Sequence, residues 1–386
     1  RSEAEQKRGS LSKVIFTDEL IRFLSKQTYK YKGYEFLFSG DSVQRAVNAL
    51  DASLLQGLSM ASKEIYNLLT LGISLEENVI LDKDVPVRQS FDLSYIDFEH
   101  PANNIWQVTE EFSVERPNGQ YARPDVVLMV NGIPIVVIEC KKSSVDVKEG
   151  VLQNVRNMGP DYIPHLFKYT QLVMAMNPNK VVYGTCGTTA DYFVEWREDD
   201  IDWQKEICDR CSPDGHITEQ DRVCASMLDH TRLLTLMRDF ILYDSNIKKI
   251  ARHQQFFAVQ NAMNRINGTD SSDSTGGVIW HTQGSGKTAL SYYNVKALTD
   301  YFQKRGTIAK FYFIVDRLDL MKQAAGEFGK RGLSVELVKD KSEFISNIQS
   351  QSSNDESGNP VINVVNIQKF SADSMTKKAD YNLNVQ

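Results

Sequence analysis

Three ionisable residues lie at the ends of two neighbouring apolar runs. The stretch 123–142 reads RPDVVLMVNGIPIVVIECKK, with Asp125 before the first run and Glu139, Cys140 and Lys141 closing the second. Side chains alternate along a strand, so Glu139 and Lys141 share one side and Cys140 points to the other. The spacing therefore directs a carboxylate and an amine to the same place.

Whether Asp125 joins this pair depends on the turn at the Asn-Gly dipeptide between the runs. An Asn-Gly pair favours a two-residue loop, which would pair Asp125 with Ile138 and put it on the opposite face. A three-residue loop over 130–132, with its glycine as a left-handed bulge, would pair Asp125 with Val137 and place both carboxylates on one side. We predict the three-residue loop, because the charges require a common face.

The two carboxylates and the lysine point to metal chemistry. Carboxylates this close repel each other unless a cation lies between them. Hard oxygen ligands, with room for water and a phosphate oxygen, suit Mg²⁺ or Mn²⁺. The chemistry that follows is metal-assisted phosphodiester hydrolysis, with Asp125 and Glu139 as metal ligands and Lys141 orienting the water or offsetting charge. The alternative is a strand end whose charges simply reach water.

This stretch resembles the PD-(D/E)xK nuclease family, with Pro-Asp at 124–125 and Glu-Cys-Lys at 139–141 in the motif positions. The resemblance implies a DNA-cleaving site on adjacent strands. It also implies a Gln-x-x-x-Tyr element on the next helix, where Gln153 is a catalytic candidate and Asn157 stands in place of the tyrosine. An early helical carboxylate is implied too, for which Glu19 is the candidate, with a solvated helix face as the alternative.

A glycine-rich segment in the second half has the context of a phosphate-binding loop. In GGVIWHTQGSGKTALSYYNVKAL, a short apolar strand is expected before the loop and a helix after it. Backbone N–H groups at Gly284 and Gly286 would surround phosphate oxygens, while Lys287 would reach the β- and γ-phosphates and Thr288 would hold Mg²⁺. The strict pattern has glycine where this sequence has His281.

Other segments resemble motifs of superfamily 2 helicases. Arg252 and Gln255 in IARHQQFFAV resemble the adenine-reading segment before the phosphate loop, with a plain amphipathic helix as the alternative. Two apolar strands follow the loop, one ending at 316–317 and one near Gln368, and strand ends on this side are where ligands bind. The candidate nucleotide-binding residues are Arg252, Gln255, Thr282, Gly284, Ser285, Gly286, Lys287 and Thr288.

Length and composition suit a globular protein of more than one domain. The 386 residues are 41% hydrophobic and 24% charged, and no run of about 18 apolar residues could cross a bilayer. Five cysteines are too few for a disulfide framework, so we expect a cytoplasmic protein. The net charge of −6 comes largely from residues 195–221, and the near-neutral remainder neither supports nor excludes a local basic channel.

Apolar periodicity divides the chain into four segments. Residues 1–75 have mainly helical spacing, and residues 201–248 are predicted as an acidic boundary with a helical connector. Strand and helix alternation after 249 predicts a parallel α/β sheet. Between residues 75 and 201, a mixed sheet with a helix at 145–158 is predicted. Its expected strands are 105–114, 126–130, 133–138, 171–176 and 181–186.

This order resembles the restriction (R) subunit of type I restriction-modification enzymes. We expect an α/β protein with a PD-(D/E)xK endonuclease domain at 1–200, the connector at 201–248, and a P-loop (RecA-like) first helicase lobe at 249–386. That lobe would be incomplete, because no apolar strand ending in Asp-Glu occurs before Gln386. The resemblance implies Mg²⁺ and ATP as cofactors, and an ATP-dependent endonuclease that translocates and cleaves double-stranded DNA.

The same resemblance implies partners and leaves alternatives. The expected partners are duplex DNA and the methylation (M) and specificity (S) subunits, and no membrane is expected. The 386-residue chain alone is expected to bind ATP weakly and to hydrolyse little of it, since metal and transition-state contacts come from missing elements. One alternative is a standalone superfamily 2 helicase or translocase with a degenerate nuclease-like clamp. Another is a non-catalytic scaffold that docks partners through the acidic surface at 195–221.

Overall fold

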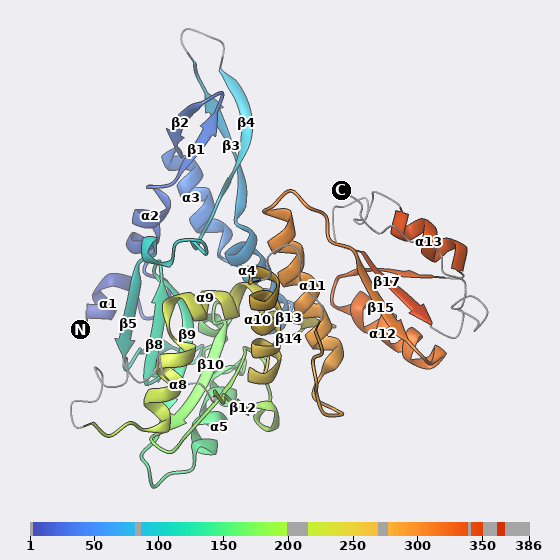
Figure 1. Cartoon of the computed structure of the whole chain (residues 1–386). Helices are drawn as coiled ribbons and strands as arrows, with labels where there is room; N and C mark the ends of the chain where they lie inside the picture. Colours follow the sequence, from blue (N-terminus) through green and yellow to red (C-terminus); the bar gives the residue numbers. More distant parts are fainter. Residues whose placement is uncertain are drawn as a thin grey trace. The chain divides into compact units, whose positions relative to one another are not determined.

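The chain divides into two compact units. The computed structural model describes residues 3–81, 86–198, 215–268, 277–338, 341–349 and 361–366 (Figure 1). The first unit holds residues 1–241 and 246–250, and the second holds 242–245 and 251–386. The chain passes from one to the other through strands β13 (Ile241–Asp244) and β14 (Ile247–Ile250).

A mixed six-stranded sheet forms the core of the first unit, as predicted. Its order is β12-β11-β10-β9-β8-β5, and β9 and β10 are its parallel pair. A parallel pair needs a crossover connection, which here contains helix α5 (Val147–Asn157), packed on β9, β10 and β11. The strands are β5 (Trp106–Glu110), β8 (Val126–Val130), β9 (Ile133–Cys140), β10 (Leu172–Asn177), β11 (Lys180–Gly184) and β12 (Val194–Glu195).

The prediction that residues 1–75 are mainly helical was wrong for one segment. Strands β1 (Thr28–Tyr31) and β2 (Tyr34–Leu37) form a hairpin there. Its turn has two successive residues with positive φ, Lys32 at 47° and Gly33 at 85°, which matches the twist of a two-residue hairpin. The run TYKYKGYEFL alternates aromatic and polar side chains, as a strand does, and Tyr29 stacks on Phe91 at 4.1 Å between ring centroids.

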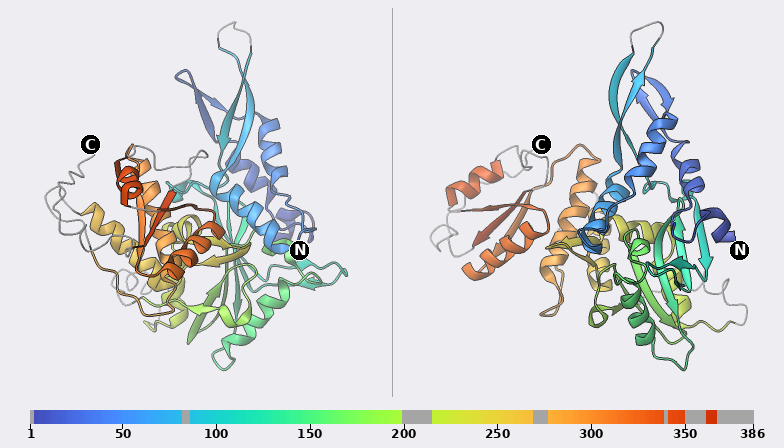
Figure 2. Two further views of the ribbon diagram at one scale, coloured as in Figure 1. Left: turned by 90° about the vertical axis from the view of Figure 1, so that its right-hand side faces the viewer. Right: turned by 180° about the vertical axis from the view of Figure 1, so that it is seen from behind.

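The remaining elements of the first unit surround this sheet and hairpin. Strands β3 and β4 pair along their whole length and extend away from the six-stranded sheet (Figure 2). The helices are α1 (Glu3–Arg8), α2 (Thr17–Leu24), α3 (Gly40–Ala49), α4 (Leu58–Leu71), α6 (Pro164–Phe167), η1 (Pro101–Asn103) and η2 (Ala190–Tyr192). The further strands are β3 (Ile73–Val79), β4 (Val87–Leu93), β6 (Val114–Glu115) and β7 (Tyr121–Ala122).

The segment predicted as a helical connector contains two helices followed by strand β13, and both helices belong to the first unit. Helices α8 (Glu219–Met227) and α9 (His230–Asp239) bury their apolar faces there. Trp196 Nε1 donates to Ser226 Oγ at 2.9 Å, and Tyr66 Oη donates to the carbonyl of Met237 at 3.2 Å. Buried contacts of this kind make α8 and α9 part of the first unit's core rather than a free link.

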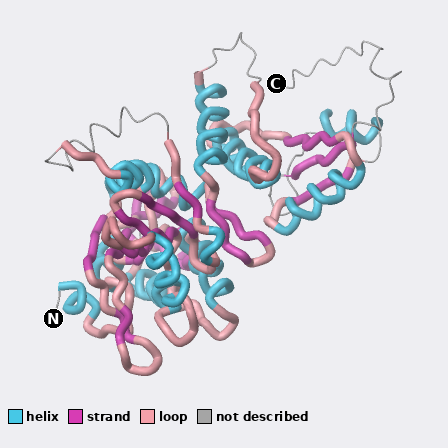
Figure 3. Tube along the Cα trace, turned by 90° about the horizontal axis from the view of Figure 1, so that it is seen from below, coloured by secondary structure: helices cyan, strands magenta, loops and turns pink. Residues whose placement is uncertain are grey.

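A three-stranded parallel sheet lies in the second unit, which confirms the predicted α/β alternation. Its order is β15-β17-β16, and Figure 3 shows these strands with helices beside them. The strands are β15 (Phe311–Val315), β16 (Ser334–Leu337) and β17 (Val361–Asn366). The helices are α10 (His253–Asn267), α11 (Lys287–Gln303), α12 (Leu318–Lys330) and α13 (Lys341–Gln349).

The strand expected before the phosphate loop is absent from the described residues. Residues 277–282 form no ladder, and Val278 and Trp280 are 90% and 89% exposed. The apolar run has strand propensity, but it pairs with no described strand, and an unpaired short strand is not stable in water.

Among the described residues, no helix is both long enough and apolar enough to span a membrane.

Candidate active site

The turn between β8 and β9 differs from the predicted one. Val130 pairs with Ile133 across a two-residue turn, in which Asn131 and Gly132 have φ of 53° and 78°. The predicted three-residue loop was therefore wrong. The Asn131 side chain, buried completely, explains the choice: Oδ1 accepts from Ile105 N at 2.7 Å, and Nδ2 donates to the Tyr95 carbonyl at 2.9 Å.

An irregularity inside the strands restores the predicted common face. The register shifts between Leu128 and Met129, whose partners are Val136 and Pro134, so one extra residue lies in β9. Farther along, Val126 pairs with Ile138, and the next positions on each strand are the two carboxylates. Proline has no N–H for a ladder and is found at bulges in central strands, so Pro134 was the sequence signal for this shift.

The structure brings Asp125, Glu139 and Lys141 together. Asp125 Oδ2 accepts a hydrogen bond from the backbone N–H of Cys140 at 2.7 Å. Lys141 Nζ lies 3.8 Å from Asp125 Oδ2 and 3.7 Å from Glu139 Oε2. The Glu139 side chain is fully buried, whereas that of Asp125 is 38% exposed. The open side of this arrangement is therefore at Asp125.

Burial makes the Glu139 carboxyl a poor anion. Desolvation, followed by the nearby charge of Asp125, raises the pKa of Glu139 to about 8, against the opposing effect of Lys141. Glu139 Oε2 is also a buried oxygen without a hydrogen-bond partner. Such an atom carries a desolvation cost unless a proton or a cation reaches it.

Helix α5 contributes two side-chain amides to these charges. Lys141 Nζ donates to Gln153 Oε1 at 2.9 Å, and Asn157 Nδ2 donates to Glu139 Oε1 at 3.4 Å. Residues four apart lie on one helix face, so both amides point the same way. Asn157, where the sequence lacks the expected tyrosine, thus contacts the site.

Gly150 lets α5 approach the sheet closely. A Cβ at this position would lie 3.1 Å from Ala175 Cβ and 3.4 Å from Glu139 Cβ. Asp146 caps the helix by accepting from Lys148 N at 2.9 Å, which fixes where its first turn begins. The amide face of α5 is therefore set by a cap at its start and a glycine at its closest approach.

Glu19 does not join this site. On α2 it pairs with Arg22 and lies 3.7 Å from Lys7 Nζ, and its Oε1 accepts from Gln107 Nε2 at 3.2 Å. Its Cβ lies by Gly132, at the turn end of the hairpin and thus opposite the carboxylate end. The expectation of an early helical carboxylate is not met by this residue.

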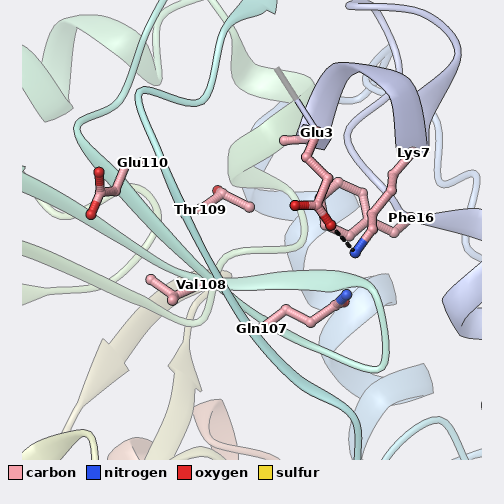
Figure 4. A pocket seen from close by; sticks show the side chains of 8 residues that line it. Glu3, Lys7, Phe16, Gln107, Val108, Thr109 and Glu110 are labelled. Atoms are coloured by element: carbon pink, nitrogen blue, oxygen red, sulfur yellow. Dashed lines mark ion pairs between the residues drawn. The ribbon is translucent and has the colours of Figure 1, made fainter. Parts of the chain in front are cut away.

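A pocket of about 400 Å³ also lies apart from the carboxylates. Residues from α1, the following loop and β5 line it, including Phe16 and Val108 (Figure 4). Glu3 and Lys7 on its wall form an ion pair at 3.1 Å.

In the described part of the chain, no three His, Cys, Asp or Glu side chains lie together as a ready-made metal site. The hairpin brings two carboxylates together, Asp125 and Glu139.

The phosphate loop leads directly into α11. Gly284 and Gly286 have φ of 76° and 83°, a left-handed conformation that glycine adopts readily. Lys287 is the first residue of α11 and is exposed, and Thr288 follows it. Ser285 is buried, with its Oγ donating to the Thr282 carbonyl at 2.8 Å. The free backbone N–H groups at the start of α11 therefore lie at the loop, as anion binding requires.

Gln255 on α10 holds this loop in place. It is 5% exposed, and its Nε2 donates to the carbonyls of Ser285 and Gly286, both at 3.2 Å. Its Oε1 accepts from the backbone N–H of Arg252 at 2.9 Å, while the Arg252 side chain is exposed. The structure therefore brings Gln255 to the loop, whereas Arg252 is joined to Gln255 through its backbone.

The two predicted strand ends after the loop are described only in part. Asp316 follows β15, and Arg317 Nε donates to Asp319 Oδ1 at 3.1 Å at the start of α12. Strand β17 ends at Asn366, and Gln368 lies outside the described residues.

Comparison with known families matches most of the chain. Residues 1–192 match the family described as "Type I restriction enzyme R protein N terminus (HSDR_N)", and residues 254–385 match "SWI2/SNF2 ATPase". The hairpin site and the phosphate loop thus lie within separate matched families.

Curated relatives agree with these matches. A protein named as the endonuclease subunit of type I restriction enzyme MjaIXP, from Methanocaldococcus jannaschii, is 29% identical over 70% of this chain and 27% of its own length. The SsaAORF53P endonuclease subunit from Staphylococcus saprophyticus is 28% identical over 75% of this chain and 30% of its own. The HindI endonuclease subunit from Haemophilus influenzae is 26% identical over 82% and 29%.

The chain therefore spans less than a third of the length of these relatives. A restriction-protein match over the first unit is followed by an ATPase match over the second, and the relatives extend across both. On these grounds the chain belongs to the family of type I restriction enzyme R proteins.

Proposed function

We propose that the first unit cleaves the phosphodiester backbone of double-stranded DNA with the help of Mg²⁺. The observation that carries this is the convergence of three groups, with Lys141 Nζ within 4 Å of both Asp125 and Glu139. A strand end whose charges merely reach water would not bury one carboxylate completely. The names of the relatives, endonuclease subunits of type I restriction enzymes, support the same function.

The residues at the hairpin fit a divalent ion. The Glu139 and Asp125 carboxyl groups lie close enough to share a hydrogen bond, and Glu139 Oε2 is a buried oxygen, so a divalent ion could take the place of the shared proton. Hard oxygen donors of this kind suit Mg²⁺. When bound, Mg²⁺ would lower the pKa of a water molecule and offset negative charge on the phosphate.

The remaining residues position these groups. The Cys140 N–H fixes one oxygen of Asp125. Gln153 orients the Lys141 amine, so that its remaining N–H groups can orient the attacking water or stabilise charge on the phosphate. Asn157 holds Glu139 Oε1 and thereby presents Oε2. Asp125, Glu139, Lys141 and Gln153 are the proposed catalytic residues.

For the second unit we propose ATP binding at the phosphate loop. Backbone N–H groups from 284 to 288 would receive phosphate oxygens, Lys287 would contact the β- and γ-phosphates, and Thr288 would hold Mg²⁺. The buried amide of Gln255 supports this by fixing the loop carbonyls, so the loop need not be ordered by the ligand. Arg252, Thr282 and Ser285 complete the proposed site.

For the full-length protein we propose activities beyond those of the two sites. An R protein of this family would couple ATP hydrolysis to translocation of duplex DNA, and would work with methylation (M) and specificity (S) subunits. We propose the cytoplasm as the place of action, because both substrates are there. The 386-residue chain alone is expected to bind ATP and turn it over slowly.

The decisive experiment is Asp125→Ala in the full-length R subunit assembled with its partner subunits. We expect DNA cleavage to fall by about 100-fold or more, because a metal ligand is lost, while ATP hydrolysis continues. Asp18→Ala, on an exposed turn of α2, is the matched control and should cleave normally. Unchanged cleavage by Asp125→Ala would refute the site. Mn²⁺ titration distinguishes an inactive DNA clamp, which need not bind metal.

A further inference from the structure

Two arginines contact one tyrosine ring near the candidate active site. The guanidinium carbon of Arg116 lies 4.0 Å from the centroid of the Tyr162 ring, and that of Arg156 lies 5.2 Å from it. Arg116 follows β6, Arg156 lies on α5, and Tyr162 lies in the loop after α5. A guanidinium stacked on a ring keeps its N–H edge free for a second partner.

The positive charges of this cluster are not neutralised by nearby carboxylates. Arg116 donates to the carbonyl of Asp161 at 3.2 Å and to Gln120 Oε1 at 3.0 Å, both neutral acceptors. Among the described residues, neither Arg116 nor Arg156 forms an ion pair within 4.0 Å. Two cations on one ring repel each other, so an anion bound between them would gain free energy from both.

Both arginines are linked to the catalytic groups, Arg156 through space and Arg116 through the chain. Arg156 precedes Asn157, which contacts Glu139, and the positive charge of Arg156 opposes the rise in the pKa of Glu139. Along the chain, β7 pairs with the strand that ends before Arg116, and Asp125 follows β7 after a short segment. Arg156 is therefore within electrostatic range of Glu139, and Arg116 follows the first strand of the pair whose second strand leads to Asp125.

We propose that Arg116, Tyr162 and Arg156 form a subsite for a DNA backbone phosphate next to the bond that is cleaved. This proposal rests on the proposed nuclease function. Guanidinium groups bind phosphate oxygens through paired N–H donors, and Tyr162 acts as the positioning residue that keeps both planes in place. Arg156 is exposed rather than enclosed in a pocket. Such a surface fits a phosphate of a long polymer better than a free anion, which needs donors on all sides.

Binding of a short labelled DNA duplex by the 386-residue chain tests the subsite, with Ca²⁺ as the divalent ion and a series of salt concentrations. Arg116→Gln and Arg156→Gln should each weaken binding about threefold to tenfold and lower the salt slope by about 0.9. Tyr162→Leu should also weaken binding, and Tyr162→Phe should restore it because the ring is kept. Arg22→Gln, on α2 at the far end of the hairpin, is the control for loss of one positive charge.

Several outcomes would overturn the subsite. Wild-type affinity and salt slope in both arginine variants would do so, as would an equal loss in Arg22→Gln, which indicates general electrostatics. Displacement of the duplex by inorganic phosphate at constant ionic strength, lost in Arg156→Gln, would assign the cluster to a free anion instead. Failure of the nuclease function is seen separately, because Asp125→Ala is read out as DNA cleavage by the assembled full-length subunit, whereas the arginine and tyrosine variants are read out as duplex affinity of the 386-residue chain.

Discussion

The two candidate sites are held in place in opposite ways. At the hairpin, side chains hold side chains: Lys141 donates to Gln153, and the completely buried Glu139 is contacted by Asn157. At the phosphate loop the working groups are backbone N–H groups, and the buried Gln255 fixes the loop carbonyls. The hairpin site therefore depends on register and charge, whereas the loop depends on the conformation of its glycines.

The largest expected effect is a loss of nucleotide affinity at the phosphate loop. In Gly286→Ala, the new Cβ would lie 2.5 Å from Gln255 Nε2, at a φ of 83° that strains any other residue. Both effects should deform the loop, and we expect affinity for an ATP analogue to fall by about 100-fold, equivalent to about 2.7 kcal/mol. Isothermal titration calorimetry of the 386-residue chain measures this.

Gly284→Ala is the matched control. Its φ of 76° imposes a similar strain, but no atom lies within 4 Å of the added Cβ, so its loss of affinity should be smaller. Equal losses in the two variants would mean that Gln255 does not hold the loop, and the contrast between the sites would weaken.

For the hairpin, the next prediction concerns register rather than charge. Asn131→Ala removes the acceptor for the N–H of Ile105. It also removes the donor for the Tyr95 carbonyl and for Asn104 Oδ1. Leaving these groups unsatisfied should destabilise the first unit by about 2 kcal/mol. Chemical denaturation followed by the fluorescence of buried Trp196 measures the change.

Asn179→Ala provides the comparison for this variant. Asn179 is exposed in the turn between β10 and β11, so its replacement should cost less than about 0.5 kcal/mol. If Asn131→Ala were as mild as Asn179→Ala, the turn would not set the register, and the position of Asp125 would need another explanation.

The hairpin also shows how far sequence reasoning reaches. The strands, the crossover helix and the meeting of Asp125 with Glu139 and Lys141 follow from apolar patterning and from the cost of isolated charges. The turn was predicted wrongly because charge was used to place the extra residue, whereas Pro134 marks it inside β9. The contact of Asn157 with Glu139 depends on the rotation of α5, which Gly150 permits and local sequence does not reveal.

Tertiary contacts explain the other differences. Residues 28–37 lie between two segments with helical spacing but themselves alternate aromatic and polar residues, and Tyr29 packs on Phe91, far away in the sequence. The apolar run at 278–280 has strand composition but no described strand beside it. Propensity alone decides neither case, because sheet formation depends on which partner is available.

The last prediction concerns pH, and its expected effect over a single pH unit is smaller than the effects above. The pKa of Glu139 in the folded chain is raised from 4.5 to about 8 by burial and by Asp125. Between these values the folded state holds a proton that the unfolded state has released, so stability falls as pH rises from about 5 to about 8. The slope should be at most about 1.4 kcal/mol per pH unit. Denaturation of the metal-free chain at several pH values, followed through Trp196, measures it.

Glu139→Gln and Mn²⁺ sharpen this prediction in different ways. Glutamine cannot ionise, so the variant should lack this part of the pH dependence and be more stable than the wild type at pH 8. Mn²⁺ should flatten the wild-type curve, because a bound cation stabilises the ionised carboxylate, and should leave Glu139→Gln unchanged. A steep curve in the variant would place the titrating group elsewhere. The phosphate loop, built from backbone groups that do not titrate, should show no such pH dependence of its folding.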